Sequence, residues 1–273
     1  MILAYWVHHW DPFLFKFTDT IGVRYYGLAY VLGFVGAAWI MIRYVRTGRT
    51  QLTETQIGDL MVSMVIGVIA GGRLGYFLLY DLEAVLANPM SLLRVWSGGM
   101  SFHGGLLGVA LAIVWSSWRQ KIPSRHIADV VASVTSIGLL FGRLANFING
   151  ELWGRIATVP WAVVFPQSVP ARTDFSQIAA RHPSQLYEAF LEGAVLLAYA
   201  QWRYWRTAIT RVHPGHLAGE YLIGYGVARI VCEVFREPDA ELILGLSRGT
   251  FYSIFLFVAG AGFIRRSRTP VRK

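Results

Sequence analysis

Seven apolar blocks near twenty residues long are the feature that most restricts the fold of this chain. A helix of about twenty residues spans the hydrocarbon core of a bilayer, so the blocks predict membrane-spanning helices. With 55% hydrophobic and only 15% charged residues, the 273-residue chain is too apolar for an ordinary soluble domain. We therefore expect an all-α polytopic membrane protein with seven transmembrane helices. The predicted spans are residues 21–44, 57–80, 101–118, 127–149, 184–205, 216–235 and 250–264.

The segments outside these blocks predict an arm, a head and a tail. Residues 1–20 mix aromatic side chains with histidine and aspartate, which suits the membrane interface better than a span. No basic region precedes their first apolar residues, so we expect no cleaved signal peptide. Prolines punctuate residues 150–183, which therefore predict a small head. The expected organisation is an interfacial arm (1–20), spans one to four (21–149), the head (150–183), spans five to seven (184–264) and a basic tail (265–273).

The positions of lysine and arginine orient this bundle. Fourteen basic residues lie in the connections that follow the odd-numbered spans, and seven lie in the segments on the opposite side. Because positively charged loops stay in the cytoplasm, we expect the N-terminus outside and the C-terminus inside. A net charge of +9 would suggest a nucleic-acid partner in a soluble protein. Here the charge clusters between apolar blocks, so we expect orientation charge and no nucleic acid.

Four arginines fall inside predicted spans instead of loops: Arg24, Arg73, Arg143 and Arg229. With the predicted orientation, all four lie towards the outer leaflet. A charged side chain at membrane depth usually faces a bundle interior and pairs with a counter-charge or an anionic ligand. The segments around Arg73 and Arg143 resemble each other over six positions, but so short a match is explained equally well by chance.

The segment from Phe141 to Gly154 places an arginine, two amides and a carboxylate at the end of an apolar run. If the helix continues to Asn149, then Arg143 and Asn146 share one helical face. A ligand site is one interpretation of this face. The alternative is a structural arginine tied to a neighbouring carboxylate.

Glycines surround His103 at the start of the third span. A helix N-terminus here would offer free N–H groups and a positive dipole to an anion, and Gly104 would let the anion approach the backbone. Glycines at this position equally suit a close helix crossing in the membrane. His103 is either a proton acceptor in the reaction or a residue that only makes a hydrogen bond.

The sixth span carries a polar stripe of Tyr225, Arg229, Glu233 and Arg236. Glu233 is able to pair with either arginine, so one of the two arginines would then be structural. Cys232 lies on the same stripe, where a small apolar role is commoner than a nucleophilic one. In the first span Tyr26 is a further candidate, although tyrosines at this level are usually interface residues.

Arginines, glycine-rich backbone and a histidine at one membrane depth suit an anionic headgroup, most simply a phosphodiester. The chain has no H-E-x-x-H motif and no carboxylate cluster of the kind that binds magnesium. With a single cysteine it has no cysteine-built metal site either. We expect no metal at this site.

The run from Gly142 to Gly154 reads G-R-x-A-N-F-I-N-x-E-x-x-G, which resembles the signature of the prolipoprotein diacylglyceryl transferase family. Further matches are Arg24-Tyr25-Tyr26-Gly27-Leu28, Ser101-Phe102-His103-Gly104-Gly105, and Tyr225-Gly226 followed by Arg229, Glu233 and Arg236-Glu237-Pro238-Asp239. The likeness extends over spans one, two, three, four and six, and Cys232 is outside its pattern.

This resemblance implies a seven-span enzyme of the bacterial inner membrane that works without a cofactor at the periplasmic side. It would transfer the sn-1,2-diacylglyceryl group of phosphatidylglycerol to the lipobox cysteine of a prolipoprotein, form a thioether and release glycerol phosphate. That reaction is the first step of lipoprotein maturation. The implied partners are phosphatidylglycerol, prolipoprotein signal peptides with a lipobox cysteine, and membrane lipid.

The expected site residues combine these motifs with the chemistry they would serve. Fixed arginines stabilise a phosphate leaving group better than water does, and a histidine suits removal of the thiol proton. The nucleophile belongs to the substrate. The residues expected to be catalytic are His103, Arg143 and Arg229, and those expected to bind substrate are Tyr26, Gly104, Arg143, Asn146, Glu151, Gly154, Tyr225, Glu233 and Arg236.

Two other classes of function fit parts of the pattern. A transporter or binding protein for an anionic lipid would use the arginines as its binding site, but transport needs a path inward and the inner halves of the spans carry few charged residues. An intramembrane hydrolase would use His103 with a serine or with Cys232.

Overall fold

The computed structural model describes residues 5–18, 21–94, 98–171, 173–238 and 241–268. Contacts divide the chain into two compact units, one formed by Met1–Ala37 with Val131–Lys273 and the other by Ala38–Val130. The boundaries fall within two long helices, α1 and α5.

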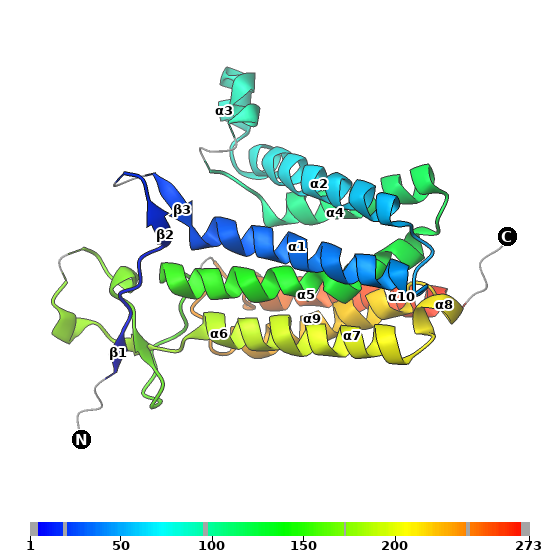
Figure 1. Ribbon diagram of the computed structural model, residues 1–273. Coiled ribbons are helices and arrows are strands. Elements are labelled where there is room, and N and C mark those ends of the chain that lie inside the picture. The colour runs from blue at the N-terminus through cyan, green and yellow to red at the C-terminus, as the bar shows by residue number, and fades with distance from the viewer. Residues whose placement is uncertain (1–4, 19–20, 95–97, 172, 239–240, 269–273) are drawn as a thin grey trace. The chain divides into compact units, whose positions relative to one another are not determined.

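The helices follow the predicted apolar blocks along the chain (Figure 1). The long ones are α1 (Tyr25–Arg46), α2 (Glu54–Tyr80), α4 (Phe102–Gln120), α5 (Ser124–Asn149), α9 (His216–Glu233) and α10 (Arg248–Ser267). The fifth block divides into α6 (Ser184–Glu188), a π-helical segment η5 (Ala189–Val195) and α7 (Leu196–Arg206). Among the described residues, α1, α2 and α5 are long and apolar enough to cross a membrane. The protein is therefore mostly helical with membrane-spanning candidates, and the number of seven spans stays a prediction.

The first helix starts later than the sequence predicted. Residues Phe13–Lys16 (β2) and Gly22–Arg24 (β3) form an antiparallel hairpin, and α1 begins only at Tyr25. The prediction that Arg24 begins a span is therefore wrong. Its guanidinium lies 4.6 Å from the centre of the Phe13 ring, a cation–π contact that the hairpin itself supplies.

The arm and the head share one small sheet within the first unit. Strand β1 (Trp6–Val7) pairs in parallel with β4 (Val163–Val164), and β4 pairs antiparallel with β5 (Ala180–Arg181). His8 of the arm is fully buried and packs edge-on against Phe147, with ring centres 5.6 Å apart. Part of the arm is therefore the edge strand of the sheet in the head, and its position in the membrane interface stays a prediction. Burial lowers the pKa of the His8 imidazole, because desolvation disfavours its charged form.

In the same unit α5, α7, α9 and α10 run side by side (Figure 1). Small residues allow their close approach. A Cβ on Gly219 of α9 would lie 2.6 Å from the carbonyl oxygen of Gly260 on α10. A Cβ on Gly33 of α1 would lie 3.2 Å from Gly138 of α5. Such contacts are typical of helices that associate in lipid, where van der Waals packing replaces the hydrophobic drive.

The second unit is centred on an antiparallel pair of helices, α2 and α4. Gly71 and Gly75 of α2 face Gly104 of α4, and a Cβ on Gly104 would lie 2.8 Å from the Gly75 Cα. Two short helices, α3 (Leu82–Ala87) and η1 (Pro89–Leu93), follow α2. Thr53 begins α2 with a capping box: its hydroxyl accepts from the Gln56 N–H while the Gln56 side chain accepts from the Thr53 N–H.

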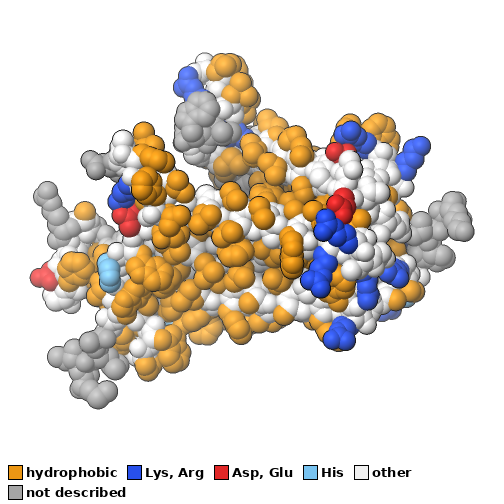
Figure 2. All heavy atoms as spheres, in the orientation of Figure 1, with side chains coloured by type: hydrophobic (Ala, Val, Ile, Leu, Met, Phe, Trp, Pro, Cys, Tyr) orange, Lys and Arg blue, Asp and Glu red, His pale blue; other side chains and the backbone are white. Residues whose placement is uncertain are grey.

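The outward surface of the consecutive helical segments α6, η5 and α7 is apolar, whereas that of a surface helix in a soluble protein would be polar. Phe190, Val195 and Trp202 are exposed along it, whereas Glu188 and Glu192 are buried. Figure 2 shows hydrophobic side chains over this flank and basic side chains near the end of α7. A contiguous apolar flank is an interaction surface, and lipid is the solvent it suits.

Candidate active site

Six charged side chains form a single ion cluster inside the first unit, and we call it the Arg–Glu cluster. Helix α5 contributes Arg143, and the α6–η5 junction contributes two glutamates one helical turn apart. The remaining members stand on α9 and directly after it. The six residues are Arg143, Glu188, Glu192, Arg229, Glu233 and Arg236.

Glu188 is the centre of this cluster, because it contacts all three arginines. Its Oε2 lies 2.7 Å from Arg143 Nε and 3.5 Å from Arg229 Nη1, and its Oε1 accepts a hydrogen bond from Arg236 Nη1 at 2.9 Å. Its side chain is 1% exposed. A carboxylate this deeply buried requires such partners, since an unpaired buried charge costs several kcal/mol.

Glu192 and Glu233 pair with the same arginines from two other directions. Glu192 accepts from Arg143 Nη2 at 3.4 Å and from Arg229 Nη1 at 3.3 Å, and Glu233 accepts from Arg229 Nη2. At the start of α10, Gly249 lies so close that a Cβ there would be 2.6 Å from Arg229 Nε. The arginine side chains nevertheless keep 6–17% exposure.

The end of α5 closes in a tight polar turn. Gly150 adopts φ +65°, a conformation that favours glycine, and it turns the chain back towards the helix. Glu151 Oε1 then accepts hydrogen bonds from Asn146 Nδ2 at 2.8 Å and from Asn149 Nδ2 at 3.2 Å. Gln185 of α6 donates to the Glu151 carbonyl at 2.6 Å. The predicted residues Asn146 and Glu151 are therefore brought together, and they are tied to the helix that carries Glu188.

Gly154 lies at a junction of three backbone segments. Its N–H donates to the His182 carbonyl at 2.9 Å, and it forms an isolated bridge with Arg236. A Cβ on this residue would lie 2.6 Å from the His182 oxygen and 2.5 Å from the Phe235 oxygen. Gly154 is thus a packing residue that holds the head against the segment directly after α9, which contains Arg236.

Replacement of Gly154 by alanine should therefore displace the head from Arg236. Overpacking at a backbone contact costs about 1–3 kcal/mol, so we expect a lower midpoint of thermal unfolding in detergent together with reduced activity. Gly262→Ala is a matched control, because a Cβ at Gly262 meets nothing within 4 Å. Equal unfolding midpoints for the two variants would contradict this interpretation of Gly154.

The structure places the other predicted site residues as follows. Tyr225 is half-buried on α9, one turn before Arg229. Tyr26 is the second residue of α1, and its ring packs edge-on against that of Tyr30, with ring centres 5.3 Å apart. His103 and Gly104 belong to the other unit, in the first turn of α4, where Ser101 Oγ accepts from the Gly104 N–H at 3.2 Å. For Gly104 the close-crossing alternative is the one observed, and anion binding there stays a prediction.

Arg73, the remaining arginine of the predicted set, is a structural residue of the second unit. Its guanidinium donates to the carbonyls of Ser91, Leu92 and Gly99 among others, at distances of 2.6–3.2 Å. It also lies 4.8 Å from the centre of the Phe77 ring. Arg73 therefore binds together the segment that follows α2, as a structural arginine does.

Sequence reasoning missed Glu188 and Glu192. Both stand in an apolar block whose outer face is hydrophobic, and their spacing of four places them on one helical face. Two carboxylates on one face of a predicted span were a signal for a counter-charge to the buried arginines. Arg143 is indeed tied to these carboxylates, as the structural alternative for this arginine predicted.

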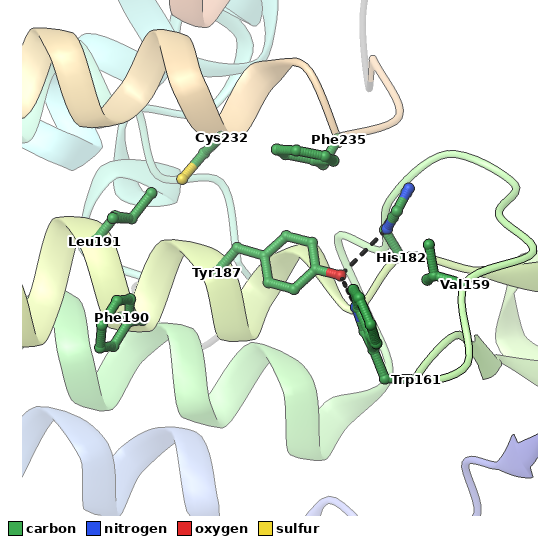
Figure 3. Close-up of a pocket in the computed structure, with 8 residues that line it drawn as sticks. All are labelled: Val159, Trp161, His182, Tyr187, Phe190, Leu191, Cys232 and Phe235. Carbon is green, nitrogen blue, oxygen red and sulfur yellow. Dashed lines mark hydrogen bonds between the residues drawn. The ribbon is translucent and has the colours of Figure 1, made fainter.

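The head, the α6–η5 segment and the end of α9 line an apolar pocket of about 450 Å³ (Figure 3). Tyr187 and Leu191 line it, and each directly precedes one of the buried glutamates, Glu188 and Glu192. Within the pocket Trp161 Nε1 donates to the Tyr187 hydroxyl at 2.7 Å, and His182 Nδ1 lies 3.2 Å from the same oxygen. Burial lowers the pKa of the His182 imidazole. Cys232 also lines this pocket and is no member of the Arg–Glu cluster.

No group of three or more histidine, cysteine, aspartate or glutamate side chains among the described residues is arranged to bind a metal ion. What the cluster offers instead is three guanidinium groups, whose planar donors match the oxygens of a phosphate or carboxylate.

Comparison with known proteins places this chain in a family. Residues 12–266 match the family model described as prolipoprotein diacylglyceryl transferase. A phosphatidylglycerol–prolipoprotein diacylglyceryl transferase of Sinorhizobium medicae is 44% identical over 270 residues, covering 95% of this chain and 92% of the relative. Proteins of the same name from Pseudoalteromonas translucida and Haemophilus influenzae are also 44% identical, covering 93% of this chain and 91% of each relative. Over residues 12–266, the chain belongs to the prolipoprotein diacylglyceryl transferase family.

Proposed function

We propose that this protein transfers the sn-1,2-diacylglyceryl group of phosphatidylglycerol to the lipobox cysteine thiol of prolipoproteins. The observation that carries the proposal is the Arg–Glu cluster, in which Arg143, Arg229 and Arg236 converge from two helices of a strongly apolar bundle. The relatives' names state the same donor and acceptor.

The reaction needs a site for charge that develops on phosphate. The thiolate sulfur attacks the glycerol carbon, a C–S bond forms and the C–O bond to phosphate breaks. Glycerol phosphate leaves with one more negative charge than the phosphodiester carried, and the thiol proton passes to a base. Preorganised donors in a site of low dielectric stabilise such charge better than water does. Arg143 and Arg229 are the donors that we assign to this step.

The remaining site residues have binding or positioning roles in this proposal. Asn146 in the last turn of α5 and Glu151 directly after the helix, which are hydrogen-bonded to each other, would bind the glycerol headgroup through their remaining hydrogen-bonding capacity. Tyr225, Glu233, Arg236 and Tyr26 would complete the headgroup site, with Gly154 holding the head in place. His103 would accept the thiol proton. No cofactor is required.

We also propose a seven-span topology in the bacterial inner membrane, with the arm and head in the periplasm and the basic tail in the cytoplasm. The excess of basic residues after odd-numbered spans supports it. Alkaline phosphatase, which is active only outside the cytoplasm, should be inactive when fused after Lys273 and active when inserted within residues 167–177. The reverse pattern would place the site on the cytoplasmic side.

Mass spectrometry tests the proposed reaction. The purified protein is incubated in detergent with phosphatidylglycerol and a lipobox peptide, and a cysteine-to-serine peptide is the control. We expect the mass gain of one diacylglyceryl group on the cysteine peptide and none on the serine peptide. Peptide cleavage would indicate an intramembrane hydrolase. An unchanged peptide together with lipid binding would favour a lipid transporter or binding protein, the second candidate that the arginines allow.

A further inference from the structure

The two glutamates that sequence reasoning missed stand at an unusual place in the helix. Glu188 ends α6, and Glu192 lies within the π-helical segment η5. A π-helical turn widens the helix and shifts the side chains that follow it, and such turns are frequent at functional sites. Here the turn keeps both carboxylates facing the arginines while Phe190 and Val195 stay on the outer flank.

Helix α5 holds this π-helical segment in place. Ser136 Oγ donates to the Glu192 carbonyl at 2.8 Å, and the same hydroxyl lies 2.8 Å from the Tyr221 hydroxyl of α9. Gly193 approaches so closely that a Cβ would lie 2.8 Å from the Leu140 Cα. Leu140 precedes Arg143 by less than one turn. The contact therefore sets the distance between Glu192 and Arg143.

The hydrogen bonding within the cluster is incomplete. Arg143 Nε and Glu188 Oε2 are 2.7 Å apart, yet the two atoms do not form a hydrogen bond, and both are buried. Their contact is one of charge and not of directed donation.

The formal charges of the cluster cancel, with three arginines against three glutamates. The phosphodiester of the proposed substrate carries one negative charge, and the glycerol phosphate that leaves carries two at neutral pH. An uncompensated set of arginines would hold the product more tightly than the substrate, because attraction grows with the charge of the ligand. Buried carboxylates reduce this difference.

We propose that Glu188 and Glu192 are positioning residues that hold the guanidinium groups of the arginines in place. By cancelling the positive charge of these groups, the two carboxylates also allow glycerol phosphate to leave. The inference rests on the proposed function for its substrate. It concerns the affinity of the Arg–Glu cluster for glycerol phosphate. Removing one carboxylate without changing its shape raises the cluster's charge by one, so the product binds more tightly and turnover becomes limited by its release.

The test compares Glu188→Gln and Glu192→Gln with Glu220→Gln. Glu220 is a matched control, because it is a partly buried carboxylate on α9 paired with Arg203 at 2.5 and 2.8 Å. It also precedes Glu233 by roughly 20 Å of helix. Binding of sn-glycerol 1-phosphate is measured by calorimetry in detergent, and kcat and KM for phosphatidylglycerol are measured with the lipobox peptide.

We expect each cluster variant to bind sn-glycerol 1-phosphate about tenfold more tightly, with kcat at least about tenfold lower and KM not raised. Glu192→Asp keeps the charge, so its affinity for the product should stay near that of the wild type. Glu220→Gln should change neither product affinity nor the ratio of kcat to KM, whatever it does to stability.

Weaker product binding in both glutamine variants would overturn the inference, since the carboxylates would then be needed only to hold the arginines. Unchanged product binding would overturn it as well, because the cluster would not contact phosphate. If one variant fails to fold, the other decides. Tighter product binding by the glutamine variants, together with no transfer by the wild-type protein, would keep the inference and reject the proposed function.

Discussion

Replacement of Arg143 by lysine is expected to reduce diacylglyceryl transfer nearly as much as replacement by alanine. The guanidinium contacts Glu188 through Nε and Glu192 through Nη2. An ammonium is a point charge on a flexible stem and cannot keep both carboxylates while it binds phosphate oxygens. Losing one charge-assisted contact in the transition state costs about 2–4 kcal/mol, or about thirty- to a thousandfold in rate.

The measurement is kcat/KM for thioether formation with Arg143→Lys and Arg143→Ala, each normalised to folded protein. Arg203→Lys is the matched control, because Arg203 also pairs with a carboxylate through Nε and Nη2 but stands outside the cluster. We expect Arg203→Lys to retain activity within a few-fold. Near-native transfer by Arg143→Lys would show that positive charge alone suffices and would refute the role of the planar fork.

Replacement of His103 by glutamine is the second change for which we expect a large loss, roughly a hundredfold or more at pH 7. Only a few per cent of an ordinary cysteine thiol is ionised at that pH, so the reaction needs a group that accepts the proton. Glutamine keeps a polar side chain in the first turn of α4 but accepts no proton at this pH. His103 is half-buried there, two residues after Ser101, which caps the N-terminus of the helix.

The pH profile separates a base from a structural residue. If proton removal is the only role of His103, the deficit of the variant should shrink as the pH rises from about 6.5 to about 9.5, since the thiol then ionises unaided. His126→Gln is the control. His126 lies in the same unit and makes structural contacts with Thr50 at 2.9 Å and with the Gln51 N–H at 3.2 Å. A constant ratio of wild-type to His103→Gln rates across this range would exclude the base role.

The positions of the helices could be predicted from sequence because apolar block length and helix length are set by the same hydrocarbon thickness. The predicted span 127–149 ends at the same residue as α5, and 216–235 differs from α9 by two residues at one end. Arg24 was misplaced because a hairpin competes with the first helical turn, and hydropathy alone does not distinguish the two.

The candidate site was predictable in its arginines and in Glu233, which pairs with Arg229 as expected, but not in Glu188 and Glu192. Arg143 and Arg229 stand out in a sequence because a guanidinium in an apolar block has few explanations. Their pairing with Glu188 depends on the rotation of one helix against two others, which periodicity within a single block does not specify. The π-helical turn at residues 189–195 has no recognised signature in the chain, although it decides which way Glu192 faces.

The sequence alone determined that this chain is apolar and helical, that arginines interrupt its spans, and that its motifs are those of one enzyme family. These properties depend on residue type and spacing along one helix. Only the tertiary structure decided that Arg73 holds backbone carbonyls while Arg143 meets carboxylates, and that Gly154 is a packing contact. The physical reason is that burial and pairing of a charge are properties of several segments packed together, and no single segment carries that information.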